Sequence, residues 1–286
     1  MEGVTDKPGI TLVCCGLFGT LVADDGLIER SFAEAIATQG VVVGTSAYAR
    51  RMAQVHQARG QTPAAVLAGL FPENEARALA AHMAFDRALA DAIGRAVIRP
   101  VPGAREALEE VRAAGARICV ISSLPRRVLR TVLEALDVIP GWRGLVDVTL
   151  SAEDMPGGFP APDPVLGAMD RVGVGDARAV AIVHATGAGV EGGRRAGASI
   201  VVGVLTGAHA APRLRAAGAT HVIASVADLP DVLKASGLEP TVPPPAAAER
   251  GGHGQTKFAR RTPMARNEAG ISVPAQVPSE RRSPGP

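Results

Sequence analysis

The sequence has few aromatic residues and almost no lysine. Aromatic residues make up 3% of the 286 positions, whereas hydrophobic residues make up 47%. A core must therefore be built from Ala, Val, Leu and Ile, which suits packed helices and buried strands. The three lysines are Lys7, Lys234 and Lys257. Any mechanism that needs a lysine between residues 8 and 233 is excluded.

Cysteine and long hydrophobic runs are equally scarce. The three cysteines, Cys14, Cys15 and Cys119, lie in apolar stretches, where a free thiol behaves as a small hydrophobe. We therefore expect a reducing, cytoplasmic location. The N-terminus lacks the basic region and apolar run of a signal peptide. The longest uncharged run, between Arg195 and Arg213, is shorter than about 18 apolar residues, so we expect no membrane span.

The hydrophobic pattern changes along the chain in a way that separates a core from an insert. Residues 10–22 form an apolar run rich in Val and Leu, which predicts a central parallel strand that enters a loop. Residues 27–94 switch to helical spacing with turn signals at Gly40, Gly60 and Pro72, which indicates a small helical insert.

Helices and strands alternate after residue 100. The pattern predicts helices over 103–114, 125–136, 162–172 and 188–196, and strands over 116–122, 145–150, 179–183 and 200–204. Alternation of this kind predicts crossover connections and a parallel sheet covered on both faces. We therefore expect a doubly wound α/β fold, with a core formed by residues 9–22 and 100–236 and a helical cap formed by residues 23–99.

The C-terminal segment 237–286 has a different composition. Nine of the 22 prolines lie within residues 238–286, and no apolar periodicity is present, so we expect a disordered tail. Seven Lys and Arg against four Glu give this segment a net charge of +3. That excess is too small to predict specific nucleic-acid binding.

The order of five segments resembles the haloacid dehalogenase superfamily, in its phosphonatase-like branch with a cap inserted after strand one. Together they span residues 10–233, and they read LVCCGLFGTLVADDGLIERSFAEAI, RPVPGAREALEEVRAAGARICVISS, GGFPAPDPVLGAMDRVGV, AIVHATGAGVEGGRRAGA and GVLTGAHAAPRLRAAGATHVIASVADLP. The resemblance implies a Rossmann-like core, a cap domain, and phosphohydrolase chemistry that depends on four short motifs and Mg²⁺.

The first of these motifs has lost both of its acids. It normally reads Asp-x-Asp-Gly-Thr, where the first carboxylate attacks phosphorus and the second protonates the leaving group. Alignment on Gly19 and Thr20 places Gly16 at the nucleophile position and Phe18 at the acid position. Neither residue can perform the reaction.

The second motif is the one that survives. It supplies a Ser or Thr whose hydroxyl holds a phosphate oxygen, and Ser122 fits this position. The same hydroxyl is equally suited to cap the helix that begins near Pro125, because Ser is a preferred capping residue whatever the function.

The third and fourth motifs have lost their charged groups. Phe159 replaces the Lys or Arg that neutralises phosphate, and Ala185 and Gly189 replace two acids that contribute to the Mg²⁺ site. Because Mg²⁺ requires oxygen ligands, we expect no bound metal and no other cofactor. The cap lysine that phosphonatases use as a Schiff base aligns near Pro63, so cleavage of phosphonoacetaldehyde by that route is excluded.

Few residues offer a replacement. Cys15 precedes the nucleophile position and points to the opposite face of an alternating strand, so we interpret it as a packing residue. His184 lies beside the fourth motif and is suited to act as a base or ligand, or to be structural. We interpret Asp24 and Asp25 as loop or helix-capping residues.

Of three further residues, two have two interpretations each. Arg126 and Arg127 begin a helix near the expected cleft and fit either a solvated helix surface or contact with an anionic ligand. Trp142, the only tryptophan, stands in a loop and is most simply a packing anchor.

We therefore predict a catalytically inactive family member with a binding, regulatory or complex-supporting role. The remnant ligand pocket is expected to contain Gly19, Thr20, Ser122, Ser123 and His184. Since Phe18 and Phe159 replace charged groups, we expect an open, more apolar cleft that suits a small ligand or a protein segment. We keep a homodimer as an alternative to a monomer, and we expect no membrane partner. Two alternatives are a hydrolase that uses non-standard residues around His184, and a scaffold whose tail is the functional element.

Overall fold

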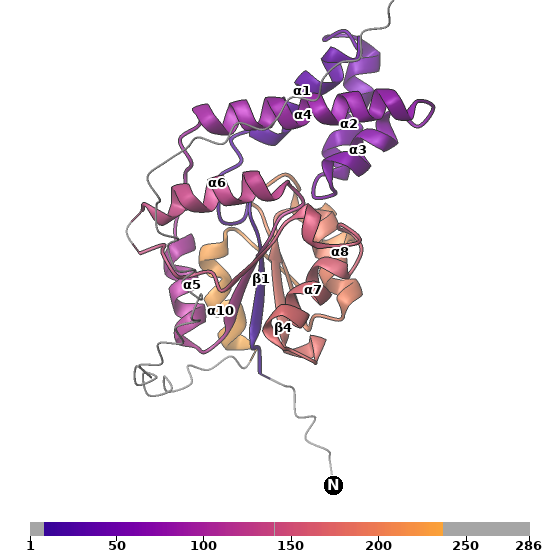
Figure 1. The fold of residues 1–286 in the computed structure, drawn as a ribbon. Coiled ribbons are helices and arrows are strands. Elements are labelled where there is room, and N and C mark those ends of the chain that lie inside the picture. The colour runs from indigo at the N-terminus through magenta and orange to yellow at the C-terminus, as the bar shows by residue number, and fades with distance from the viewer. Residues whose placement is uncertain (1–8, 140, 237–286) are drawn as a thin grey trace, which may run out of the picture. The chain divides into compact units, whose positions relative to one another are not determined.

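A parallel β-sheet forms the centre of the protein (Figure 1). The computed structural model of the chain describes residues 9–139 and 141–236, and this part contains six strands in one sheet. They are β1 (Leu12–Gly16), β2 (Arg117–Ile121), β3 (Val148–Leu150), β4 (Val180–His184), β5 (Ile200–Val204) and β6 (His221–Ile223). Their order is β3-β2-β1-β4-β5-β6, and neighbouring strands are parallel. The order reverses at β1, and ligands of open parallel sheets usually bind in the crevice at such a reversal.

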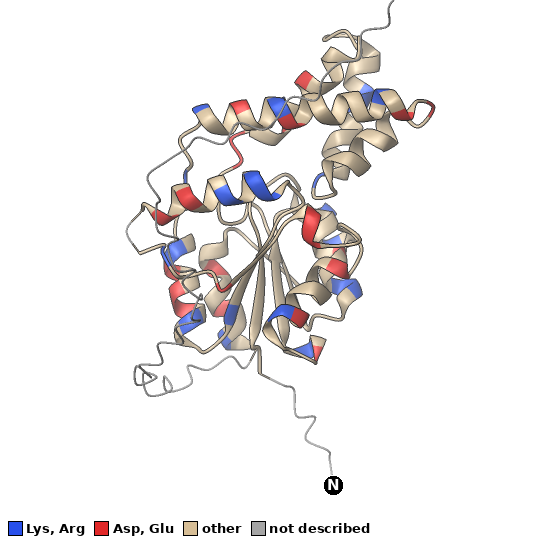
Figure 2. Cartoon of the chain, viewed as in Figure 1, with Lys and Arg blue, Asp and Glu red and all other residues tan. Residues whose placement is uncertain are grey.

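Helices cover both faces of this sheet. One face packs against α5 (Ala104–Ala113), α6 (Arg126–Asp137) and α10 (Leu229–Ala235), and the other against α7 (Asp163–Val172), α8 (Gly187–Ala196) and α9 (Ala211–Ala216). Side chains alternate along β1, because Val13 and Cys15 join the first cluster while Leu12 and Cys14 join the second. Charged residues lie mostly on the helices and connections (Figure 2). The predicted doubly wound α/β fold is confirmed.

The first strand is shorter than the apolar run that predicted it. β1 ends at Gly16, and the chain then turns back, with the amides of Leu21 and Val22 donating to the carbonyl of Leu17 at 2.9 and 3.1 Å. The turn is as apolar as the strand because Leu17, Leu21 and Val22 are all buried. The other predicted elements agree with the structure to within a few residues, and three short 3₁₀ helices occupy Ala152–Asp154, Ala177–Ala179 and Val226–Asp228.

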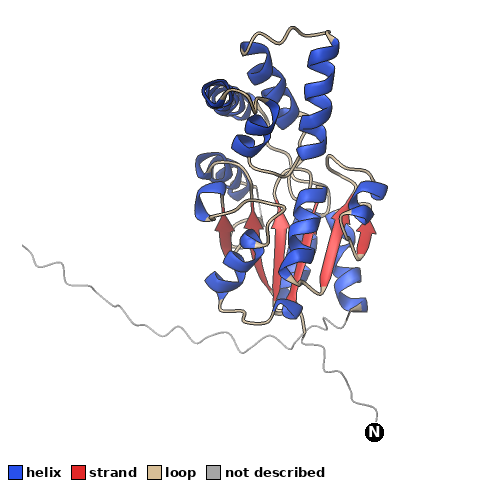
Figure 3. Ribbon diagram, turned by 90° about the vertical axis from the view of Figure 1, so that its right-hand side faces the viewer, coloured by secondary structure: helices blue, strands red, loops and turns tan. Residues whose placement is uncertain are grey.

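Four helices lie between β1 and α5 in the sequence, and we call them the cap helices. They are α1 (Leu27–Thr38), α2 (Ser46–Ala58), α3 (Pro63–Leu70) and α4 (Glu75–Arg95). Thr45, Thr62 and Asn74 begin the last three, since each side chain accepts a hydrogen bond from an amide in the first turn. The cap helices lie beyond the carboxyl ends of the strands (Figure 3).

The core and cap limits at residues 22/23 and 99/100 stay predictions, as the described residues form one compact unit. The predicted tail, 237–286, lies outside the described residues. Within the described ranges, no helix combines the length and the apolar character that crossing a bilayer requires.

Gly193 allows α8 to approach β4 closely, and this contact can be tested. A Cβ at Gly193 would lie 2.2 Å from Cγ2 of Ile182. We expect Gly193→Ala to lower the free energy of unfolding by about 1–3 kcal/mol through overpacking, despite a helix-propensity gain of about 1 kcal/mol. Gly167→Ala in α7 is the matched control, because its Cβ would lie 3.8 Å from Leu150. Urea denaturation measures the free energy of unfolding of both variants. Equal losses in Gly193→Ala and Gly167→Ala would contradict the close contact between α8 and β4.

Candidate functional site

A small cavity lies between the carboxyl ends of β1, β2 and β4 and the cap helices. We call it the strand-end cavity, and its volume is about 50 Å³. The core contributes Leu17, Phe18, Ser122, Ser123 and His184 to its lining, and the cap segment contributes Arg59, Gly60, Gln61 and Pro63. A cavity of this size admits a few water molecules. Among the described residues that line it, none is Asp or Glu.

The imidazole ring of His184 fills the space at the end of β1. A Cβ at Gly16 would lie 2.8 Å from Cδ2 of His184 and 2.9 Å from Nε2. A Cβ at Gly189, in the first turn of α8, would lie 2.2 Å from Cγ of the same ring. Real Cβ atoms do not approach other heavy atoms so closely, so the ring requires glycine at both positions. Three substitutions that the sequence presents separately therefore form one packing arrangement.

Hydrogen bonds fix the orientation of the His184 ring. Nδ1 accepts from the amide of Thr186 at 3.2 Å, and it lies 3.0 Å from Oγ1 of Thr186, which accepts from the amide of Gly189 at 3.3 Å. The proton of the neutral ring is therefore on Nε2, the nitrogen that faces Gly16. Burial, together with the nearby His209, lowers the pKa of His184 to about 4. At neutral pH the ring presents a donor to the cavity and keeps its lone pair turned away.

Phe159 packs against the other edge of this histidine. Its ring lies edge-on to His184 with 5.2 Å between centroids, and a Cβ at Gly192 would lie 2.4 Å from its Cδ1. Phe159 is 3% exposed and does not line the strand-end cavity, whereas Phe18 does. Phe159 thus packs beside His184 and leaves the cavity small, while Phe18 contributes to the lining, so the expectation of a more apolar cleft stays a prediction.

Ala185 is enclosed by two glycines. A Cβ added at Gly19 would lie 3.0 Å from the Cβ of Ala185, and a Cβ added at Gly207 would lie 2.2 Å from it. Oγ1 of Thr206 also donates to the carbonyl of Gly19 at 2.7 Å, so the loop after β5 closes over the turn after β1.

The predicted remnant pocket is only partly assembled. Ser122, Ser123 and His184 line the strand-end cavity, but Gly19 and Thr20 do not. Thr20 is fully buried, and its Oγ1 has no hydrogen-bond partner among the described residues.

The hydroxyl of Ser122 has a local role that differs from the predicted cap. It accepts from the amide of Leu124 at 3.2 Å, while the amide of Ser122 donates to the carbonyl of Leu150 at 2.8 Å. The N-cap residue of α6 is Pro125, and the first amide of this helix, that of Arg126, donates to the carboxylate of Glu153 at 2.8 Å. The capping interpretation of Ser122 is therefore wrong, since the hydroxyl closes a turn before the helix begins.

The residues at the end of the sheet do not fit a magnesium ion. Mg²⁺ prefers oxygen ligands in octahedral geometry, and the side chains of Gly16, Ala185 and Gly189 carry no oxygen. In the described part of the chain, no group of three or more His, Cys, Asp or Glu residues is placed to hold a metal. The donor set of the site therefore differs in kind from the one that the family resemblance implies.

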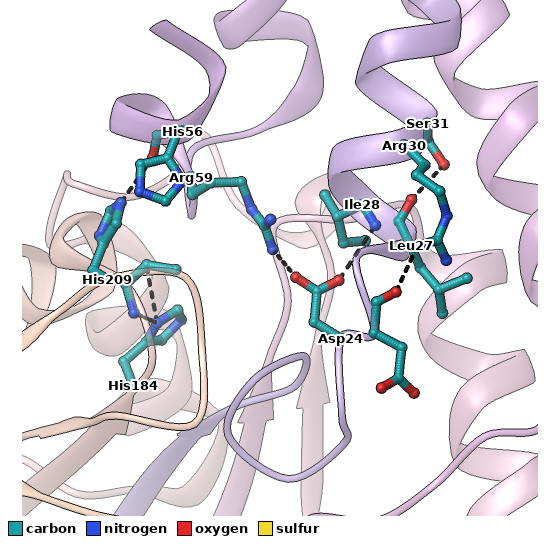
Figure 4. Close-up of polar contacts among 11 residues, drawn as sticks. Asp24, Leu27, Ile28, Arg30, Ser31, His56, Arg59, His184 and His209 are labelled. Atoms are coloured by element: carbon teal, nitrogen blue, oxygen red, sulfur yellow. Dashed lines mark hydrogen bonds and ion pairs between the residues drawn. The ribbon is translucent and has the colours of Figure 1, made fainter. Parts of the chain in front are cut away.

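Arg59 is a buried residue of this site that sequence reasoning missed. It lies at the C-terminal end of α2, is 7% exposed, and places Nη2 2.5 Å from Oδ2 of Asp24 (Figure 4). The other oxygen of Asp24 accepts from the amide of Ile28 at 3.3 Å in the first turn of α1. Asp24 therefore has the loop and capping role that we predicted, and in addition it neutralises Arg59.

His209 joins the core to the cap. Its Nδ1 accepts from the amide of Gly187 at 2.8 Å, so Nε2 carries the proton and donates to the carbonyl of His56 at 2.8 Å (Figure 4). Arg213 donates to the next carbonyl, that of Gln57, at 3.3 Å. Carbonyl groups at a helix C-terminus lack intrahelical partners, and these two core side chains supply them for α2.

The cap also touches α8 directly. Gly60 has a φ of +95°, and a Cβ there would lie 2.1 Å from Oγ1 of Thr186. Glycine is required here both by the left-handed backbone and by the close approach. The cap segment is thus held against the same threonine that orients His184.

The remaining candidates are engaged by protein groups. Arg126 pairs with Asp154 at 2.9 Å, and Arg127 donates to the carbonyl of Asp86 in α4 at 2.9 Å. Cys15 is fully buried, and burial raises the pKa of its thiol. Trp142 is buried in the core, as a packing anchor should be.

Comparison with known proteins identifies the family of this chain and several relatives. A model of the haloacid dehalogenase-like hydrolase family matches residues 10–197. The phosphonoacetaldehyde hydrolase of Bordetella pertussis is 35% identical over 159 residues, which cover 47% of this chain and 56% of that protein. The corresponding protein of Bordetella avium is 40% identical over 98 residues, or 34% of each chain. The matches thus span about half the length of the first relative and about a third of the second.

Solved structures show the same fold. A phosphonoacetaldehyde hydrolase-like protein from Oleispira antarctica superposes with a TM-score of 0.69 at 20% identity, covering 82% of this chain and 95% of its own. A hydrolase from Pseudomonas syringae gives a TM-score of 0.67 at 22% identity, with coverages of 79% and 98%. The family match over residues 10–197, together with the strand order, shows that the chain belongs to the haloacid dehalogenase-like hydrolases.

Proposed function

We propose that this family member does not catalyse phosphoryl transfer or phosphonate cleavage, and that it acts by binding a small ligand or a protein partner. The observation that carries the proposal is the position of the His184 ring. It occupies the space that a side chain at Gly16 or Gly189 would need. A nucleophile and a metal ligand at these positions are therefore incompatible with the packing of the site.

The chemistry of the lining residues supports the same conclusion. A general acid alone contributes roughly 10²–10⁴-fold in rate, and the strand-end cavity contains no carboxyl group in its described lining. The Bordetella relatives are named for the hydrolysis of phosphonoacetaldehyde. Pro63 lies where the resemblance places their Schiff-base lysine, and no lysine occurs between residues 8 and 233.

A hydrolase based on His184 is the alternative, and the geometry argues against it. A general base must direct a lone pair at the proton that it removes. The lone pair of His184 is on Nδ1, which already accepts from Thr186. With a pKa of about 4, the ring also holds no second proton to give at neutral pH.

The cellular location and the binding partners of the protein also belong to this proposal. The three cysteines are buried and free, which supports a reducing, cytoplasmic setting. A protein partner, a second copy of the chain or a small ligand all remain compatible with a binding role. We propose no specific nucleic-acid or membrane partner.

An activity assay tests the proposal directly. With MgCl₂ present, we expect no turnover of p-nitrophenyl phosphate or phosphonoacetaldehyde above that of Ser122→Ala, and no change in His184→Ala. Product release is followed by absorbance and by a coupled aldehyde assay. Turnover that requires Mg²⁺ and is lost in Ser122→Ala would remove the proposal. A metal-independent activity lost only in His184→Ala would favour the alternative.

A double-mutant cycle tests the packing on which the proposal depends. We expect Gly16→Ala to cost about 2 kcal/mol of unfolding free energy in the wild type, because its Cβ meets the His184 ring. In a His184→Ala background the cost should fall by about 1 kcal/mol, a coupling typical of residues in contact, and the contact with Oγ1 of Thr20 at 2.9 Å accounts for the cost that stays. Gly175→Ala, whose Cβ would meet nothing within 4 Å, is the control. The same cost in both backgrounds would show that the ring is not what excludes a side chain.

The low pKa of His184 predicts acid sensitivity. Its pKa is about 4 when folded, against an ordinary value of 6.5, so only the unfolded chain takes up the proton between these pH values. Stability is therefore unaffected above pH 6.5 and falls as the pH drops towards 4, by about 3 kcal/mol at about 1.4 kcal/mol per pKa unit. Urea unfolding from pH 7 to pH 4.5 should show a shallower loss for His184→Gln. Parallel curves for the two proteins would rule out a buried, neutral His184.

A further inference from the structure

The two segments that connect the cap helices to the core lie side by side. The amide of Ala23 donates to the carbonyl of Arg99 at 2.9 Å, and the amide of Val101 donates to the carbonyl of Leu21 at 2.8 Å. Where these segments meet α1 and α4, the surface has a hollow of about 550 Å³. We call it the hinge hollow, and its lining includes Asp25, Leu27, Arg30, Arg95, Val97 and Arg99. It shares no lining residue with the strand-end cavity.

The hinge hollow carries an excess of positive charge. Three guanidinium groups and one carboxylate line it, which gives a net charge of +2. Arg99 pairs with Asp25 at 2.8 Å, but in the described part of the chain neither Arg30 nor Arg95 has an ion-pair partner. Like charges that converge on a concave surface raise the local potential and attract anions.

Asp25 organises two of these arginines. Its φ is +46°, which lies in the left-handed region that a non-glycine residue occupies at an energetic cost. The carboxylate of Asp25 binds Arg99, and its carbonyl accepts from Nη1 of Arg30 at 2.7 Å. One strained residue thus holds two guanidinium groups at the rim of the same hollow.

From this arrangement we infer that the hinge hollow binds a phosphate group carried by a small organic molecule. Guanidinium groups match the geometry of phosphate oxygens and bind them through paired hydrogen bonds. Leu27 and Val97 supply apolar surface, and Val97 is 82% exposed. An apolar group on the ligand therefore has a surface to cover.

The location of the hollow gives such a ligand a structural effect. Arg30 belongs to α1, Arg95 to α4, and Arg99 to the second connecting segment. A phosphate that contacts all three bridges both crossings between cap and core. Binding thus holds the two connecting segments together. The inference does not depend on whether the strand-end cavity is catalytically inactive.

Isothermal titration of the full chain without Mg²⁺ tests the inference, with phenyl phosphate and inorganic phosphate as probes. We expect phenyl phosphate to bind more tightly, because it also covers the apolar surface. Arg95→Gln should weaken binding at least about tenfold, the effect of one charge-assisted contact of about 1.4 kcal/mol. Arg87→Gln, on the same helix but outside the hollow, should leave it unchanged. Raising NaCl from about 50 to about 500 mM should weaken binding as screening increases.

Three results would overturn the inference, and each has a different cause. Phosphate binding that Ser122→Ala removes and Arg95→Gln spares would place the anion in the strand-end cavity and overturn the inference. Equal losses in Arg95→Gln and Arg87→Gln would reduce the site to general surface charge, and no heat from either probe at millimolar concentration would also overturn it. Circular dichroism confirms that each variant is folded, as all of the substituted arginines are exposed.

Discussion

The contact of the His184 ring with Gly16 and Gly189 determines most of what this site can do. The ring fills the carboxyl end of the sheet at the point where the strand order reverses, between β1 and the first turn of α8. Because it is buried and neutral, it replaces a charged, hydrated centre by a dense and uncharged one. Phe159 packs on its edge and requires glycine at position 192 in turn. One aromatic pair thus accounts for three glycines and for the small volume left above the strands.

Core side chains hold the cap over the His184 ring mainly by binding main-chain atoms of the cap helices. His209 and Arg213 bind carbonyl groups at the end of α2, and Arg127 binds a carbonyl of α4. These core side chains come from two faces of the sheet and bind mainly backbone atoms, which depend on where the helices end more than on which side chains the cap carries. Arg127 also pairs with the carboxylate of Asp86 at 3.9 Å. The ion pair of Arg59 with Asp24 lies within the cap and its first connection.

The sequence was sufficient for the architecture and for the identity of the residues at the end of the sheet. Alternating apolar segments predicted the parallel sheet, and the spacing around Gly19 and Ser122 predicted which positions lack acids. It was insufficient for the packing, because the contact between Gly16 and His184 depends on β1 lying next to β4, which are 168 residues apart in the sequence. The same limit hid Arg59 and His209, whose partners are backbone carbonyls or distant acids. The turn after β1 was misjudged because buried turns and strands share an apolar composition.

The contact between Gly16 and the His184 ring also limits how a carboxylate could be engineered into this site. An acid introduced at position 16 alone would bring its Cβ to 2.8 Å from the ring and 2.9 Å from Oγ1 of Thr20, and one at position 189 would bring its Cβ 2.2 Å from the same ring. Any redesign of this end of the sheet therefore has to change position 184 together with the glycines around it.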